Sequence, residues 1–106
     1  MSGSGGGGGG GAPDAIPCGE LEFDTQIATP QAKALPGLMI GNILEVVVVP
    51  MNGAQVVAVR KGAEVVGGLA GGLVNRLREC LLQGKRFSAT VLKINGAQVS
   101  IHVEPA

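Results

Sequence analysis

Two Asn-Gly dipeptides, each set between β-rich segments, constrain the fold of this chain more than any other feature. Asn52-Gly53 lies between "ILEVVVVP" and "AQVVAVRK", and Asn95-Gly96 lies between "KRFSATVLKI" and "QVSIHVE". Asn-Gly suits the positive φ angles of a two-residue turn, so both sites predict β-hairpins, over about residues 43–60 and 86–104. The pentapeptide "NGAQV" occurs at both sites and indicates repeated turn chemistry, not a repeated domain.

The segment between the two hairpins has the spacing of an amphipathic helix. Leucines recur there at four-residue steps, at Leu69, Leu73, Leu77 and Leu81. Gly84 suits the left-handed residue that often follows a helix. The predicted fold class is therefore α+β: a small β-rich domain, either barrel-like or an open sheet, with one helix over about residues 69–82.

The chain of 106 residues is long enough for one small domain. Residues 2–11 are all Gly or Ser and cannot bury apolar surface, so we expect a flexible tail over 1–18 and one β-rich domain over 19–106. The tail is consistent with native low complexity and with an engineered linker. It lacks the charged and apolar regions of a signal peptide. No apolar run approaches the roughly 18–20 residues of a membrane span, so a membrane is not an expected partner.

The two cysteines, Cys18 and Cys80, could form a disulfide in principle. Without a secretory signal, however, we expect reduced thiols and an intracellular protein, cytoplasmic or nuclear and not secreted. No Cys/His cluster has the spacing of metal ligands, so the sequence predicts neither a metal site nor a cofactor.

The net charge of zero hides an asymmetry along the chain. Residues 1–54 carry five acidic side chains against one lysine, a net charge of −4, whereas residues 55–94 carry seven basic side chains against two acidic ones, a net charge of +5. Such a division indicates an anionic partner for the basic half. The alternative is a solvated surface on which the two halves neutralise each other.

Two glycine pairs precede the predicted helix, at Gly67, Gly68, Gly71 and Gly72. They match neither a P-loop, since no Lys-Ser or Lys-Thr follows, nor a dinucleotide-binding fingerprint. "GLAG" fits the GXXG loop of KH domains, but the helix that normally precedes that loop is missing. Two interpretations remain open: backbone N–H groups that contact an anion, and close packing of the backbone against a neighbouring strand.

No catalytic constellation is evident, and the protein is not expected to be an enzyme. His102 is the only histidine and lies in an alternating strand, where a surface position is the simplest explanation. Glu20, Glu22 and Asp24 share one strand face by their spacing, which is typical of a solvated edge.

One set of residues follows the pattern of a known module: a proline with an asparagine two places on, an alanine eight places after the proline, a glycine turn, and Val-Gly-x-Leu before a helix. The matching residues are Pro50, Asn52, Ala58, Gly62, Val66, Gly67 and Leu69. This order, over about residues 35–103, resembles that of a HIRAN domain, a small β-barrel module found at the front of some DNA-remodelling ATPases and alone in bacteria. The resemblance implies a β-barrel scaffold that holds a single-stranded DNA end.

The chain departs from the HIRAN pattern where the family contacts DNA. Val48 or Val49 stands in place of the usual arginine, and aliphatic or amide side chains replace the tyrosine-aspartate pair and an asparagine, at Ala54, Gln55 and Val57. The residues typical of the HIRAN fold are therefore retained better than the residues that contact DNA in that family.

The sequence favours a small binding module that contacts nucleic acid, as single-stranded DNA or a DNA end, through its basic central segment. The candidate residues are Arg60, Lys61, Arg76, Lys85 and Arg86, with anion contacts from the backbone of Gly67, Gly68, Gly71 and Gly72. Arg76 is expected to act with Lys85 or Arg86 near the end of the helix. Only Phe23 and Phe87 offer aromatic rings for base stacking, so phosphate contacts would dominate. The alternative is a protein-interaction or self-associating adaptor, including a homodimer, that uses exposed strand edges.

Overall fold

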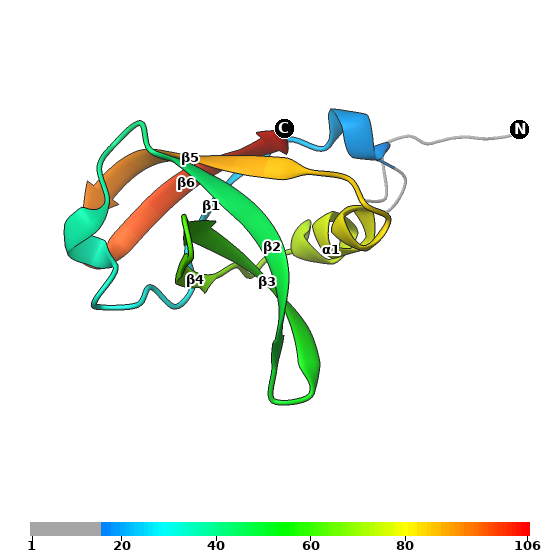
Figure 1. The fold of residues 1–106 in the computed structure, drawn as a ribbon. Coiled ribbons are helices and arrows are strands. Elements are labelled where there is room, and N and C mark those ends of the chain that lie inside the picture. The colour runs from blue at the N-terminus through cyan, green and yellow to red at the C-terminus, as the bar shows by residue number, and fades with distance from the viewer. Residues whose placement is uncertain (1–15) are drawn as a thin grey trace, which may run out of the picture.

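The computed structural model describes residues 16–106, which form a six-stranded antiparallel sheet and one helix. The spatial order of the strands is β1-β6-β5-β2-β3-β4 (Figure 1). Their bounds are β1 Phe23–Gln26, β2 Ile43–Met51, β3 Ala54–Lys61, β4 Glu64–Gly68, β5 Phe87–Asn95 and β6 Gln98–Pro105. The fold class is thus α+β and rich in sheet, as the sequence predicts.

Both predicted hairpins are confirmed. β2 pairs with β3 from Glu45↔Arg60 to Met51↔Ala54, around a turn in which Asn52 and Gly53 have φ angles of 51° and 81°. Positive φ at both central residues is the geometry that Asn-Gly favours. β5 pairs with β6 around a second turn, and a bulge interrupts that ladder between Val91 and Lys93. Asn95 is still in β5 and pairs with Gln98, so this turn consists of Gly96 and Ala97, one position later than the predicted Asn95-Gly96.

The core follows the period-two alternation of the strands. The inward positions of the second hairpin are almost fully buried, at Phe87, Ala89, Val91, Val99, Ile101 and Val103. Val57, Val59 and Val66 add a second aliphatic group from the other half of the sheet. Since burial of apolar surface is the main favourable term in folding, this cluster defines the domain.

The helix is shorter than its leucine spacing predicts. α1 spans Val74–Leu82, so the predicted start at Leu69 is wrong by five residues. Leu69 is buried, but it follows β4 and forms an isolated bridge to Ile27, which holds it in an extended conformation. Gly71, with a φ of 132°, then turns the chain toward α1. The four-residue spacing of the leucines therefore does not mark one helix: it begins at the bridge residue Leu69, crosses a turn and ends in α1.

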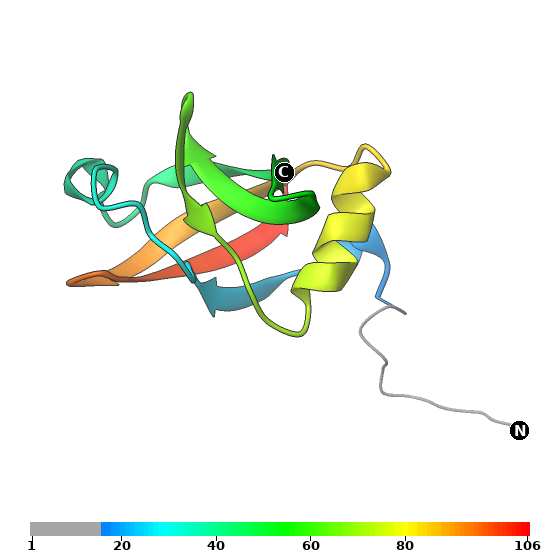
Figure 2. The same ribbon diagram turned by 90° about the horizontal axis from the view of Figure 1, so that it is seen from below.

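α1 covers one end of the sheet and lies beside the N-terminal segment (Figure 2). Leu77 and Cys80 point into the core and are fully buried. Cys80 forms a disulfide with Cys18, which corrects the prediction of reduced thiols. The pairing joins positions 62 residues apart, and the sequence alone holds no signal that would place a tail-proximal cysteine beside the helix.

Ordered packing begins before the predicted domain boundary at residue 19. Ile16 and Cys18 pack against the core, and a one-turn 3-10 helix spans Cys18–Glu20. The glycine-rich stretch 2–11 lies outside the described residues. Within residues 16–106, no helix has the length and apolar character needed to cross a membrane.

The two outer strands approach each other without closing the sheet. After β1, Ile27 bridges to Leu69, and Ala28 N–H donates to Gly68 O at 2.8 Å. Gln31 N–H also donates to Val66 O at 2.7 Å. The segment after β1 therefore lies against β4, although no continuous ladder joins them.

Candidate binding groove

β2 parts from β5 in the middle of the sheet. The two strands pair only from Ile43↔Thr90 to Glu45↔Ser88, whereas β2 stays paired with β3 as far as Met51. The outer half of this hairpin projects away from the body of the domain (Figure 1). Beyond Glu45, β2 is consequently an edge strand on the side that β5 has left.

The backbone groups of Val48 point toward this open side. Pro50 pairs with Gln55 yet has no N–H to donate, so this is a non-hydrogen-bonded pair. Because such pairs alternate with hydrogen-bonded ones along an antiparallel ladder, the backbone N–H and C=O groups of even-numbered residues of β2 face away from β3. Val57, which pairs with Val48, turns its carbonyl the other way and accepts a hydrogen bond from Leu69 N–H at 2.9 Å. Within residues 16–106, no group of the chain bonds to Val48 on the open side.

An open groove of about 780 Å³ lies where β2 parts from β5 and includes the first part of the free edge, residues 46–48. One wall is β2 at residues 43–48, and the other is formed by the end of α1 and the segment 84–88 that leads into β5. Ile43 and Leu82 at the rim are 71% and 56% exposed. A groove that combines apolar walls with a free strand edge has the two features used in strand addition, because main-chain bonds give affinity and side-chain pockets give specificity.

Two cations line the groove directly before the start of β5. Lys85 and Arg86 line it, and among the described residues no ion pair engages either of them. The single acidic side chain in the wall, Glu45, is instead paired with Arg60 at 2.7 Å. The groove thus presents positive charge beside an aliphatic floor.

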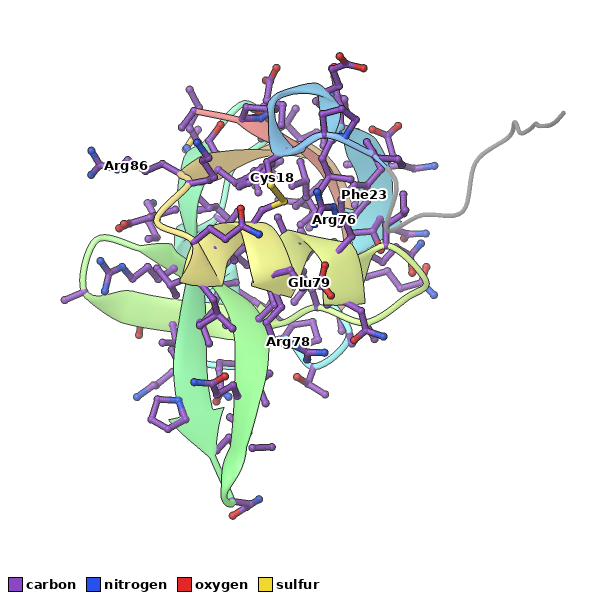
Figure 3. All side chains as sticks on the ribbon, turned by 90° about the vertical axis from the view of Figure 1, so that its right-hand side faces the viewer. Cys18, Phe23, Arg76, Arg78, Glu79 and Arg86 are labelled. Atoms are coloured by element: carbon purple, nitrogen blue, oxygen red, sulfur yellow. A yellow bond between two sulfur atoms is a disulfide. The ribbon has the colours of Figure 1, made fainter. Side chains whose placement is uncertain are left out.

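The predicted basic residues do not gather on one surface. Arg76 is only 16% exposed at its side chain, and it donates to Ile16 O at 2.8 Å and pairs with Glu79 at 3.0 Å. Arg86 lies at the opposite end of the helix (Figure 3), so the predicted partnership of these two arginines is not formed. Lys61 donates to Gly37 O at 2.6 Å. Of the five predicted residues, Lys85 and Arg86 are the pair that the fold brings to one groove.

The four glycines have different positions. Gly67 and Gly68 lie in β4, and a Cβ on Gly67 would come within 2.5 Å of Ile27 Cγ2 and 2.6 Å of Thr29 O. Close packing therefore accounts for Gly67. Gly71 and Gly72 precede α1, whose first residue is Val74. Only these two remain near a helix N-terminus, and no side-chain cap is present there.

His102 lies in a polar cluster on the opposite edge of the sheet. Its Nδ1 is 2.5 Å from Asp24 Oδ1, and its Nε2 is 2.7 Å from Glu22 Oε2. The hydrogen bond with Asp24, followed by that with Glu22, raises the pKa of His102 above its ordinary value. Sequence reasoning placed these residues on solvated strand faces but missed the cluster, because the β1–β6 pairing joins positions about 80 residues apart.

The chain matches no family model, no curated protein and no solved structure. The HIRAN resemblance therefore stays a prediction.

Proposed function

We propose that this protein is a non-enzymatic protein-interaction module that accepts an extended segment of a partner along the free edge of β2. The observation that carries the proposal is the parting of β2 from β5 after Glu45, which leaves the backbone of Val48 unpaired beside an apolar groove. A partner strand would satisfy these groups with main-chain hydrogen bonds, as in other cases of strand addition.

The groove favours a partner segment of particular chemistry. Apolar walls suit aliphatic side chains at alternate positions, because successive side chains of a strand point to opposite faces. Lys85 and Arg86 suit a carboxylate at the end of the segment that lies near them. The preferred ligand is accordingly an extended aliphatic segment that ends in, or is flanked by, an acidic group.

A pair of substitutions at one position tests the proposal. Val48→Pro removes the N–H on the open side, where Pro50 already shows that β2 tolerates proline, whereas Val48→Ala shortens the side chain and keeps the N–H. Peptides selected from a random display library on the wild-type protein should bind Val48→Ala and lose affinity for Val48→Pro. Equal binding to Val48→Pro, with its fold intact by circular dichroism, would exclude strand addition at this edge.

Nucleic-acid binding is the second candidate, and the free charges of Lys85 and Arg86 favour it. The HIRAN-like pattern adds support, and the Ile27↔Leu69 bridge between the residues that directly follow the two outer strands is consistent with the barrel-like scaffold that the pattern implies. Fluorescence anisotropy of labelled single-stranded and duplex DNA at two salt concentrations tests it. Binding should weaken with salt and in Lys85→Ala and Arg86→Ala, since phosphate contacts release counterions. No binding at low salt would remove this candidate.

A further inference from the structure

We propose that Glu22, His102 and Glu104 form a binding site for a divalent transition-metal ion of the zinc type, with Asp24 as the residue that positions the imidazole. This site is independent of the groove at β2, and it rests on the geometry of the β1–β6 edge.

Strand pairing builds the cluster from two distant parts of the chain. β1 and β6 are antiparallel with Phe23↔Val103 and Asp24↔His102 in register, which sets Glu22 beside Glu104. Val103 is fully buried, so the flanking His102 and Glu104 point to the outer face of the sheet. The residues of β5 that pair with His102 and Glu104 on the other side are Thr90 and Ser88, whose only polar side-chain groups are hydroxyls.

The donor atoms lie at distances that one ion can span. One ligand atom from each of Glu22, His102 and Glu104 falls within 4.8 Å of the other two, and His102 Nε2 is already 2.7 Å from Glu22 Oε2. Zinc binds nitrogen and carboxylate oxygen at roughly 2.0–2.2 Å in a tetrahedral arrangement, so two of its ligand atoms lie about 3.3–3.6 Å apart. Small rotations of the exposed Glu22 and the half-buried Glu104 side chains would bring all three donors to an ion, with an open position toward solvent.

Asp24 prepares the imidazole for metal binding. Its carboxylate accepts the Nδ1–H of His102, which turns Nε2 toward Glu22. A bound ion would take the place of the Nε2 proton that Glu22 now accepts, and that proton would pass to solvent. A carboxylate that holds the far nitrogen of a ligating histidine is the arrangement that fixes ring orientation in metal sites. The cluster is therefore a directed set of donors and not merely a group of acidic side chains.

Charge and donor type indicate the class of ion. Three carboxylates surround one imidazole, and among the described residues no lysine or arginine is paired with any of them. A mixed nitrogen and oxygen set suits Zn²⁺ or Co²⁺, because imidazole is a poor ligand for Mg²⁺ and Ca²⁺.

The test uses the full chain, freed of metal with a chelator, and Zn²⁺ as the probe. Because His102 is the only histidine, its ring nitrogens can be followed without ambiguity in a ¹⁵N NMR spectrum. Zn²⁺ should shift Nε2 and leave Nδ1 protonated, with one ion bound per chain by calorimetry. His102→Gln and Glu104→Gln should lose this binding, while Glu64→Gln, a carboxylate in β4, should keep it.

The variant Asp24→Asn tests whether Asp24 positions the imidazole of His102, as distinct from merely supporting the fold. It should weaken Zn²⁺ binding about 10- to 100-fold and release the fixed Nδ1–H tautomer of His102, with an unchanged circular dichroism spectrum. The proposal is overturned if millimolar Zn²⁺ leaves the His102 nitrogens unmoved. It is equally overturned if His102→Gln and Glu104→Gln bind Zn²⁺ as the wild type does, since the ion would then sit elsewhere.

Discussion

At the scale of single residues, Gly67 has a structural role that its neighbours in the glycine pairs do not share. The backbone of Thr29 and the side chain of Ile27 occupy the space in which a Cβ would lie. This close approach lets the segment after β1 hydrogen-bond to β4. The glycine is therefore required by packing of two chain segments, not by a ligand.

Gly67→Ala should lower the free energy of unfolding by about 1–3 kcal/mol, because the backbone of Thr29 must shift to admit the methyl group. Gly72→Ala is the matched control: no atom lies within 4 Å of its ideal Cβ, and a change within about 0.5 kcal/mol is expected. Urea unfolding curves of the two variants give the comparison. Similar stabilities would show that β4 and the segment after β1 do not pack closely in solution.

The raised pKa of His102 predicts that the free energy of unfolding depends on pH in metal-free buffer. Its pKa is raised in the folded state by the Asp24 and Glu22 hydrogen bonds, so its contribution is fully present below the ordinary histidine pKa of about 6.5. The contribution is lost as the pH rises through the higher folded pKa. In the presence of a chelator, the stability difference between wild type and His102→Gln should shrink from acid toward alkaline pH. A difference that grows with pH would contradict this account.

At the scale of elements, local patterns predicted the hairpins well and the helix only in part. Asn-Gly turns and alternating valines act within a few residues, so both hairpins follow from the sequence. The start of α1 could not be read from leucine spacing, because Leu69 is buried by a contact with Ile27 that lies far away in the chain. The disulfide and the His102 cluster also depend on such long-range pairings.

The disulfide ties the N-terminal segment to α1 and should contribute strongly to stability. A cross-link between positions 62 residues apart restricts the unfolded chain by about 4 kcal/mol in the loop-entropy description. Dithiothreitol should therefore lower the unfolding free energy of the wild type by about that amount and leave Cys18→Ala unaffected. If the reductant changes neither protein, the cysteines are not paired in solution.

At the scale of the whole molecule, two separate surfaces arise from where neighbouring strands of the sheet stay paired and where they part. Continued pairing of β1 with β6 gathers the His102 cluster, whereas the early end of pairing between β2 and β5 opens the groove. The first is polar and the second is apolar with two free cations. Valine-rich sequence alone predicted that strand edges exist, but it could not say which edge stays free.

The most direct test of the account is amide hydrogen exchange of β2, measured residue by residue by NMR. Val47 and Val49 bond to β3 and should exchange slowly, whereas the Val48 N–H faces the groove and should exchange faster than both. A partner segment bound at the edge should then protect Val48 selectively. Protection of Val48 equal to that of Val47 in the free protein would contradict the claim that β2 offers an open edge.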